Sequence, residues 1–284
     1  MHFRWSNIAI FGGSGSIGTA IAKEMVKTDL RQINLITNDE NSLWESQQYF
    51  KKEPRIEGIL ADIRDAETME AILMDTDYVF NCAAIKHVPI AENFPMEAIK
   101  TNLIGLENIL RACKKNHIKK LLHISTDKAV EPSSVMGATK LLCERMCLAN
   151  KWKIPASIIR FGNVYGSRGS LVPIIERKLE NNENVPITDK KMKRYFITLK
   201  KAAGIAVKCM EMMEGGEIFV PQMEEEFIVN IVDKIIAESG VPPSQVEIEY
   251  IGARAGEKLE EKLMTEDEKS RRKLIESIGV YMIK

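Results

Sequence analysis

The chain has 284 residues, of which 45% are hydrophobic and 28% are charged. Lysine and arginine together number 40, as do aspartate and glutamate, so the formal net charge is zero. This balance argues against nucleic-acid binding driven by overall charge, because such proteins concentrate positive charge on one face. No run approaches the roughly 18 apolar residues of a membrane helix, so we expect a cytoplasmic protein with no signal peptide and no membrane contact.

The first part of the chain alternates short apolar runs with helical patterns. Strands are predicted at 7–12, 33–38, 57–63, 78–84, 119–126 and 155–164, and the longest helix is predicted over 96–116. Nearly continuous apolar strands are typical of a sheet that helices cover on both faces. Their alternation with helices predicts an α/β fold with a doubly wound parallel sheet of the Rossmann type.

After residue 166 the alternation of strands and helices becomes less regular. Turn-rich connectors there separate helices predicted near 171–182, 200–213 and 227–239. Short strands are predicted at 216–220 and 246–251. We therefore divide the chain into a nucleotide-binding domain, residues 1–166, and a smaller C-terminal substrate-binding lobe, residues 167–284. Part of this second segment can return to the Rossmann sheet.

The five cysteines are odd in number and show no CxxC spacing. Cys143 and Cys147 lie four residues apart, on one face of a helix, but no matching Cys/His pair accompanies them. We interpret both as core residues and predict no metal site.

The first strand ends in a glycine-rich turn, FGGSGSIG, in which Gly12, Gly15 and Gly18 are spaced three apart. Such a turn lets the backbone approach a pyrophosphate, whose charge then lies at a helix N-terminus. Because the turn follows a strand and opens a helix, it predicts dinucleotide binding.

The end of the second strand indicates which dinucleotide binds. A carboxylate there accepts the ribose hydroxyls of NAD, whereas arginine or a small polar residue accommodates the 2′-phosphate of NADP. Thr37 and Asn38 occupy these positions, which favours NADP over NAD, although no arginine is nearby in the sequence. Asp62 follows the third strand, where it could meet the adenine amino group or equally cap the next helix.

Several further motifs follow in order, and together with the glycine-rich turn they span nearly the whole chain: NCAAIKHVPIAE (81–92), KTNLIGLENIL (100–110), STDKAVEPSSVMGATK (125–140), RFGNVYGSRGSLVP (160–173), MKRYF (192–196), GEIFVP (216–221) and GARAGEKLEEKL (252–263). They resemble the extended short-chain dehydrogenase/reductases, and more narrowly the UDP-N-acetylglucosamine 4,6-dehydratases of polysaccharide biosynthesis. Many relatives carry N-terminal membrane helices; this chain resembles a short, soluble form.

The resemblance implies oxidation at sugar C4, loss of water across C5 and C6, and return of the hydride to C6. Asp127 would then be the acid for the C6 hydroxyl, Lys128 the C5 base, and Thr126 a hydrogen-bond partner of the C4 oxygen. Burial favours the neutral forms of both ionisable groups, while their mutual attraction opposes this. The alternative is an ordinary Asp–Lys ion pair at the end of a strand.

Lys140 resembles the lysine of the Tyr-x-x-x-Lys pair that holds the nicotinamide ribose. The tyrosine position holds Met136, one helical turn earlier, and a thioether cannot accept a proton. The same substitution is a feature of one branch of these dehydratases. We interpret Met136 as an apolar wall facing the substrate, and the C4 base as Asp127 or a water that Thr126 orients.

Spacing and resemblance together place the cofactor against Gly12, Ser14, Gly15, Ser16, Ile17, Gly18, Thr37, Asn38, Asp62, Ile63, Ala83, Ala84, Lys86, Asn102 and Lys140. They place the UDP-sugar against Lys86, His87, Met136, Asn163, Arg194, Arg254 and Glu257. For His87, a role in the core or as a helix N-cap is an equal alternative. Asn102 resembles an asparagine that braces the backbone.

The leading hypothesis is therefore a UDP-N-acetylglucosamine 4,6-dehydratase that keeps NADP (or NAD) tightly bound, regenerates it in each turnover and retains the C5 configuration. A C5-inverting dehydratase, a C4 epimerase or 4-keto reductase, and a non-catalytic dinucleotide-binding protein are the alternatives. The last predicts decay at the catalytic positions, which Thr126, Asp127, Lys128 and Lys140 do not show. We expect a homo-oligomer, because relatives assemble through helices that flank the sheet.

Overall fold

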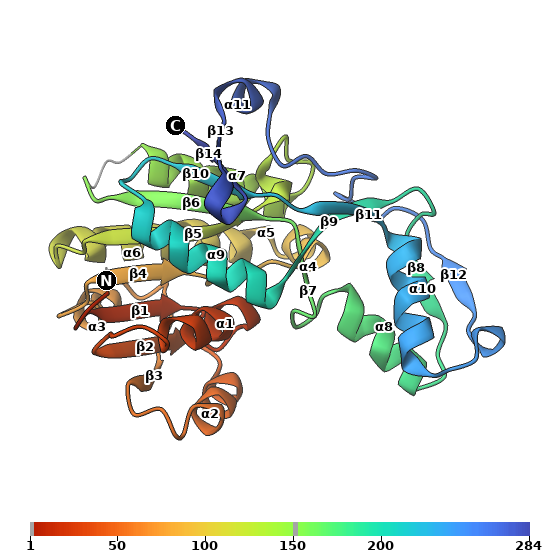
Figure 1. Cartoon of the computed structure of the whole chain (residues 1–284), viewed down its shortest axis with the longest axis horizontal. Coiled ribbons are helices and arrows are strands. Elements are labelled where there is room, and N and C mark those ends of the chain that lie inside the picture. The colour runs from red at the N-terminus through yellow and green to blue at the C-terminus, as the bar shows by residue number, and fades with distance from the viewer. Residues whose placement is uncertain (1–2, 150–152) are drawn as a thin grey trace.

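The structure is a computed structural model that describes residues 3–149 and 153–284. Within these ranges, nine strands form one sheet in the order β13-β14-β10-β6-β5-β4-β1-β2-β3 (Figure 1). From β3 to β10 the neighbouring strands are parallel, and β14 and β13 then run antiparallel. The strand bounds are β1 Asn7–Phe11, β2 Gln32–Thr37, β3 Ile56–Leu60, β4 Tyr78–Asn81, β5 Lys120–Thr126, β6 Ala156–Phe161, β10 Ile218–Pro221, β13 Lys273–Ile275 and β14 Val280–Ile283.

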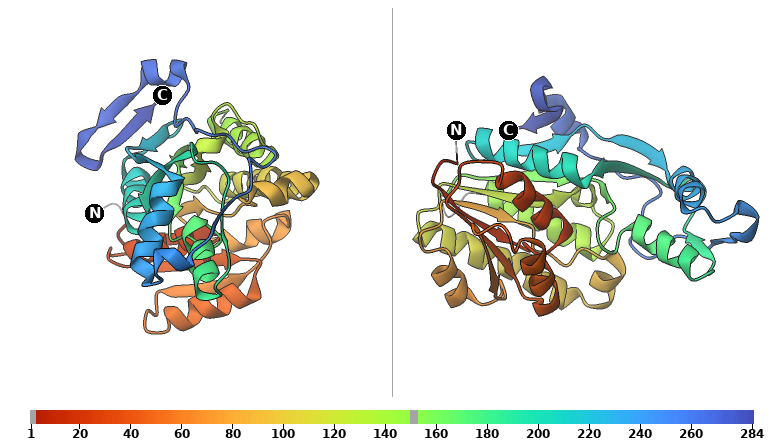
Figure 2. Two further views of the ribbon diagram at one scale, coloured as in Figure 1. Left: turned by 90° about the vertical axis from the view of Figure 1, so that its right-hand side faces the viewer. Right: turned by 60° about the horizontal axis from the view of Figure 1, so that its bottom comes forward.

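Helices cover both faces of this sheet, as the predicted doubly wound parallel sheet requires. On one face α1 packs against α9, and on the other α3 packs against α6 while α7 contacts β5 and β6 (Figures 1 and 2). Strand β1 alternates between the two layers: Ile8 and Ile10 join the first core, and Ala9 and Phe11 join the second. The helix bounds are α1 Ser16–Met25, α2 Glu40–Tyr49, α3 Ala66–Ile72, α4 Val88–Asn93, α5 Pro95–Ala98, α6 Gly105–Lys115, α7 Val135–Leu148 and α9 Leu199–Met212.

The strand order reverses between β1 and β4. In doubly wound sheets, ligands bind in the crevice outside the carboxyl ends of the strands at this switch point. The glycine-rich turn follows β1, and the 81–92 motif begins at the end of β4. The fold therefore brings the first two predicted site segments together.

The smaller lobe extends from one end of the sheet (Figure 1). It consists of α8 (Leu171–Glu180), α10 (Ile228–Ser239), and β8 (Val185–Ile187) paired with β12 (Ile248–Tyr250). Its own core includes Ile175, Val185 and Val232. A three-stranded sheet links it to the main body, through β7 (Asn163–Tyr165), β9 (Lys193–Thr198) and β11 (Glu224–Phe227).

The chain after residue 166 contributes to both parts of the molecule. Residues 171–187 and 228–250 build the lobe, whereas α9, β10, β13 and β14 return to the Rossmann sheet. Helix α11 (Glu266–Arg271) lies just before β13. A boundary at residue 166 thus separates two stretches of sequence but not two spatial units.

Two predicted elements are interrupted. The strand predicted at 155–164 breaks at Gly162, where a Cβ atom would lie 2.6 Å from the Tyr195 carbonyl oxygen, so β6 and β7 enter different sheets. The helix predicted at 96–116 contains a π-helical segment, Ile99–Ile104, before α6. That segment carries Asn102, and π-bulges of this kind often mark functional sites.

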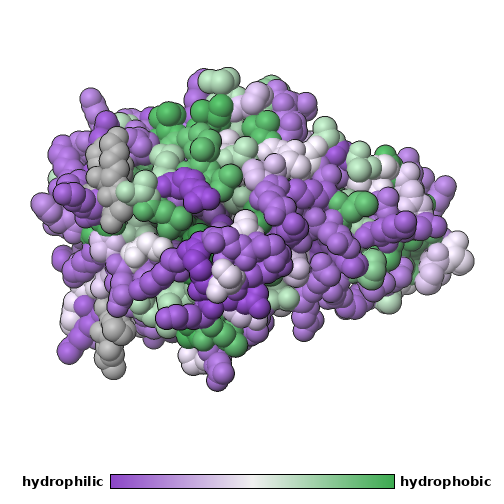
Figure 3. All heavy atoms as spheres, turned by 90° about the horizontal axis from the view of Figure 1, so that it is seen from above, coloured by the Kyte–Doolittle hydropathy of each residue, from purple (hydrophilic) through white to green (hydrophobic). Residues whose placement is uncertain are grey.

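None of the helices in the described residues is long and apolar enough to cross a membrane. The face shown in Figure 3 is largely hydrophilic, with hydrophobic side chains gathered in patches. The same ranges contain no cluster of three or more His, Cys, Asp or Glu side chains that could hold a metal ion. Cys143 and Cys147 are buried in the core beside α6.

Candidate active site

A continuous cleft runs along the carboxyl ends of β1, β2, β4 and β5 and on to the smaller lobe. Its nucleotide half contains most of the predicted cofactor residues, and its other half contains all of the predicted substrate residues. Three predicted site residues do not line the cleft: Asp62, Asn102 and Asp127. The structure thus brings together segments that are more than 200 residues apart in the sequence.

The glycine-rich turn leaves room for a ligand backbone. Gly12 adopts a left-handed conformation (φ +68°), and a Cβ atom there would lie 2.8 Å from the backbone nitrogen of Ala83. Gly18 packs against the turn so closely that a Cβ atom would collide with the Gly12 carbonyl oxygen. Helix α1 begins at Ser16, so its unpaired N–H groups face the cleft. These residues fit the pyrophosphate of a dinucleotide.

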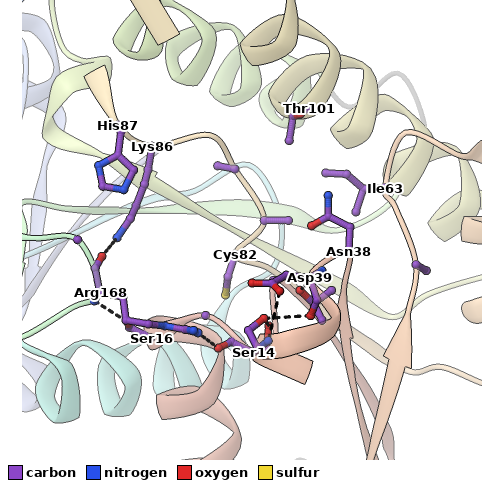
Figure 4. Close-up of a pocket in the computed structure, with 18 residues that line it drawn as sticks. Ser14, Ser16, Asn38, Asp39, Ile63, Cys82, Lys86, His87, Thr101 and Arg168 are labelled. Atoms are coloured by element: carbon purple, nitrogen blue, oxygen red, sulfur yellow. Dashed lines mark hydrogen bonds between the residues drawn. The ribbon is translucent and has the colours of Figure 1, made fainter. Parts of the chain in front are cut away.

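The end of β2 forms the adenosine side of the cleft, where Thr37, Asn38 and Asp39 all contribute to the lining (Figure 4). Asp39 is the N-cap of α2 and accepts hydrogen bonds from the backbone of residues 41 and 42. These bonds, with Ser42 first, lower the pKa of Asp39. The Ser42 hydroxyl lies 2.7 Å from that of Ser14 in the glycine-rich turn.

Asp62 lies beside this region without entering it. Its carboxylate pairs with Arg64 at 2.6 Å, and that hydrogen bond is the main reason that the pKa of Asp62 lies below its usual value. The adenine contact remains a prediction. The helix that follows is capped by Asp65 instead, so the alternative role of Asp62 as an N-cap was wrong.

Arg168 is a cleft residue that the sequence interpretation missed. It lies in the loop after β7, yet its guanidinium reaches the Ser14 carbonyl group and lies 4.0 Å from Glu45 (Figure 4). Its backbone N–H donates to the Ser16 hydroxyl at 2.9 Å. The loop therefore closes one side of the nucleotide half. The only available signal was the motif GSRGS, which gives no indication that it folds back onto the glycine-rich turn.

Lys86 and His87 follow β4 and form the junction of the two halves of the cleft. The Lys86 ammonium donates to the Arg168 carbonyl oxygen at 2.7 Å, which ties the two loops together. His87 occupies the N-cap position of α4, but its side chain makes no capping bond. Its ring packs against Gly169, where a Cβ atom would lie 2.6 Å away. This placement favours a cleft role for His87 over a core role.

Asn102 braces the loop after β4, as its family resemblance predicts. Its side chain accepts a hydrogen bond from the Ile85 N–H at 2.8 Å and donates to the Ile85 carbonyl oxygen at 3.1 Å. It also donates to the Thr139 hydroxyl of α7 at 2.9 Å. Asn102 therefore fixes the loop that carries Lys86 relative to the helix that carries Lys140.

Asp127 and Lys128 form a contact at the carboxyl end of β5. The Asp127 side chain is fully buried, and its Oδ1 atom accepts from the Thr126 hydroxyl at 2.8 Å and from the Lys128 ammonium at 3.0 Å. Its Oδ2 atom is buried without a hydrogen-bond partner. Lys128 and Thr126 line the cleft, while Asp127 lies directly behind them. A second carboxylate, Glu261, lies 3.7 Å from the Lys128 ammonium.

Lys140 is buried behind the same wall, in different surroundings. Its Nζ atom donates to the Ile124 carbonyl oxygen at 2.5 Å and lies 2.9 Å from His123 Nε2. The Ala83 N–H donates to Asn81 Oδ1, so the Asn81 amide nitrogen donates to His123 Nδ1. A neutral imidazole whose Nδ1 atom accepts must carry its proton on Nε2. That N–H therefore points towards Lys140 Nζ.

The burial of His123 and Lys140 is consistent with a neutral His123 imidazole. Burial lowers the pKa of Lys140 below its ordinary value and the pKa of His123 well below its own. The neighbouring Met136 is buried against Ala91 and Ala98 and also lines the cleft. Its thioether thus supplies an apolar wall where the resemblance expects a phenol.

The predicted UDP-binding residues lie at the lobe end of the cleft. Arg194 is buried, and its guanidinium donates to backbone carbonyl groups at positions 193, 258 and 259, so it braces the segment that carries Glu257. Arg254 has half of its side chain exposed and lies 3.9 Å from Glu257. Asn163 begins β7 and lines the cleft. Of the two arginines, only Arg254 has its guanidinium free of backbone bonds within the described residues.

The sequence matches the family model described as "Polysaccharide biosynthesis protein" over residues 8–282. The chain belongs to that family. Similar proteins include the UDP-N-acetylglucosamine 4,6-dehydratase (inverting) of Campylobacter jejuni, 36% identical over 94% of this chain and 79% of the relative. A protein named UDP-glucose 4-epimerase from Rickettsia bellii is 33% identical, over 96% of this chain and 81% of its own.

Two solved structures share the fold of this chain. Pen from Bacillus thuringiensis superposes with a TM-score of 0.95 and 31% identity, over all of this chain and 89% of its own. DesIV from Streptomyces venezuelae, a dTDP-glucose 4,6-dehydratase, superposes with a TM-score of 0.84 and 19% identity, over 96% and 94% of the two chains. At that identity, the second likeness supports the fold alone.

Proposed function

We propose that the protein is a UDP-N-acetylglucosamine 4,6-dehydratase. The observation that carries this proposal is the contact between Asp127 and Lys128 behind the cleft wall, with Thr126 bonded to the same carboxylate. Elimination of water needs an acid and a base within reach of adjacent carbon atoms. Simple dehydrogenation or C4 epimerisation needs a base for the C4 hydroxyl proton, but no acid–base pair at C5 and C6. The similar protein from C. jejuni carries the name of this activity.

The glycine-rich turn, the Asn38 region and Lys140 would hold a nicotinamide dinucleotide, which when bound supplies a hydride acceptor for C4 and a hydride donor for C6. Asp127 takes the C4 hydroxyl proton through its contact with Thr126. Lys128 then removes the C5 proton while Asp127 returns its proton to the departing C6 hydroxyl. Met136 cannot exchange protons and shapes the wall beside the sugar. The roles of Thr126 and Lys128 are proposals that rest on their positions in the cleft, and the role of Asp127 rests on its hydrogen bonds with both of them.

For the cofactor we propose NADP. Thr37 and Asn38 present no carboxylate at the end of β2, and the Asp39 carboxylate is engaged as a helix cap. Arg168 supplies the guanidinium that the sequence lacked at this point, because it reaches the same side of the cleft from the loop after β7. A planar guanidinium suits a 2′-phosphate.

The test is incubation of the purified protein with UDP-N-acetylglucosamine in D₂O, followed by NMR. A 4-keto-6-deoxy product with deuterium at C5 is expected. The sequence favours retention at C5, whereas the C. jejuni relative is named as inverting; the ring coupling constants of the product decide between them. Absence of product from protein with bound cofactor would contradict the proposal.

A second candidate is a UDP-hexose 4-epimerase, which the R. bellii relative favours by its name. The same NMR experiment separates the two. An epimerase changes only the C4 configuration and keeps the C6 hydroxymethyl group, with no deuterium at C5. A dehydratase converts C6 to a methyl group.

A further inference from the structure

Glu261 is a buried carboxylate with no hydrogen-bond partner for one of its oxygens. The residue is 6% exposed and lies in the segment that follows the smaller lobe, more than 130 residues from β5. Its Oε1 atom lies 3.7 Å from the Lys128 ammonium, and its buried Oε2 atom accepts no hydrogen bond. Asp127 shows the same pattern, with one oxygen on Lys128 and the other unpaired.

The other charged groups around Glu261 are committed elsewhere. Arg194 donates to backbone carbonyl groups, and the Lys258 ammonium donates to the carbonyl groups of residues 130 and 131 while lying 3.7 Å from Glu261 Oε2. Lys128 is therefore the cation that Glu261 and Asp127 share at the cleft.

Burial raises the pKa of Glu261 above its usual value, with the charge on Lys128 opposing the effect and that on Asp127 adding to it. The three side chains thus form one interacting group of two carboxylates and one ammonium. Two carboxylates near one ammonium repel each other, so a charge on Glu261 opposes a second charge on Asp127.

We propose that Glu261 is a positioning residue that acts through Lys128 and sets the protonation of the Asp127–Lys128 pair. This inference rests on the proposed function. In the elimination the C5–H bond breaks and its proton passes to Lys128 Nζ. The C6–O bond breaks as the oxygen takes the Asp127 proton and leaves as water, and a C5=C6 double bond forms. The negative charge of Glu261 stabilises the ammonium produced and opposes early loss of the Asp127 proton.

The first test measures Lys128 without any turnover. The protein with its nicotinamide cofactor is treated with limiting acetic anhydride across a pH series, and acetylation of Lys128, which lines the cleft, is read by peptide mass spectrometry. Glu261→Gln removes the charge and keeps the shape, so the labelling midpoint should move to lower pH by about one unit. Glu261→Asp keeps the charge and should stay near the wild-type midpoint.

Glu260→Gln is the matched control, because Glu260 is exposed and pairs with Lys193 rather than with Lys128. It should label as the wild type does. An identical midpoint for Glu261→Gln and wild type would overturn the proposal, whether or not the protein proves to be a dehydratase.

The second test uses the pH profile of product formation. In Glu261→Gln, the acidic and the alkaline midpoints of this pH profile should both move to lower pH. Loss of the negative charge disfavours the Lys128 ammonium and favours the Asp127 carboxylate. A merely structural role for Glu261 would lower the rate and leave the midpoints in place, which contradicts the proposal. If the wild type forms no product, the proposed function fails, while the labelling result still decides the role of Glu261.

Discussion

Two lysines only twelve residues apart in the sequence lie in opposite electrostatic surroundings. Lys128 has 22% of its side chain exposed, and carboxylates of Asp127 and Glu261 lie 3.0 and 3.7 Å from its ammonium. Lys140 is 5% exposed and contacts a histidine and a carbonyl group. Within the described parts of the chain, no carboxylate lies within ion-pair distance of Lys140.

The difference indicates how one wall of the cleft can serve two purposes. A lysine among carboxylates can exchange a proton with them during the elimination, as Lys128 is proposed to do. Lys140, whose pKa burial lowers, is held instead by His123 and a backbone carbonyl group.

The largest effect should come from separating the two lysines by mutation. Lys128→Met should lower C5 deuterium exchange by about 10²–10⁴-fold, because it removes the proposed base, and should leave cofactor affinity unchanged. Lys140→Met should instead weaken cofactor binding more than it lowers C5 deuterium exchange. NMR exchange and fluorescence titration of the cofactor measure the two quantities. Equal losses of cofactor affinity in both variants would contradict the separation of roles.

Arg160 is a buried cation whose guanidinium is fully hydrogen-bonded, so it can be compared with Lys128 and Lys140. Its guanidinium makes two hydrogen bonds to Glu144 and two to Glu268, and Glu144 also accepts from the Ser125 hydroxyl at 2.6 Å. Glu144→Gln should lower the free energy of unfolding by about 3 kcal/mol, since it leaves a buried network partly unpaired. Urea unfolding measures this. Glu266→Gln, on the exposed side of α11, is the control and should change stability little.

The histidine beside Lys140 should make stability depend on pH. The folded-state pKa of His123 lies well below 6.5 because of burial, so below that pH the unfolded chain takes up a proton that the folded protein does not. Stability should therefore fall as the pH drops from 7 towards 5, by up to about 1.4 kcal/mol per pH unit from this group. His123→Leu should flatten that part of the curve, at the cost of about 1–3 kcal/mol for the unpaired partners.

His117→Asn is the matched control for this experiment. His117 is exposed and has a left-handed backbone (φ 53°) that asparagine also tolerates. The variant should keep the wild-type slope between pH 5 and 7. A wild-type slope in His123→Leu would show that His123 is not the group responsible.

The sequence predicted the nucleotide end of the molecule well, because its signals are local. Six predicted strands are confirmed, with the last one split, and Gly12 and Gly18 lie where their spacing requires. Strands β9 and β11 were missed: they carry charged residues such as Lys193 and Glu225, and their partners are distant in sequence. Strands β13 and β14, of three and four residues, were also missed.

The electrostatics of the site could not be predicted, because they depend on contacts across the fold. Nothing in KKLLHIST shows that His123 would meet Lys140 and Asn81, and nothing in GEKLEEKL distinguishes the buried Glu261 from the exposed Glu260. Arg194 resembled a phosphate ligand, yet its guanidinium braces the backbone of the neighbouring segment. Charge and burial have to be known together before such residues can be given a role.

The smallest predicted effect concerns the far end of the cleft from the two lysines, where Arg168 is proposed to bind the 2′-phosphate of NADP. Arg168→Gln should weaken NADP binding by about tenfold, roughly one charge-assisted hydrogen bond, and leave NAD binding nearly unchanged. Titration of both dinucleotides measures the ratio. Arg177→Gln, on α8 and away from the cleft lining, is the control. Equal weakening for both cofactors would assign Arg168 to the shared pyrophosphate, and the choice between NAD and NADP would then rest on Thr37 and Asn38.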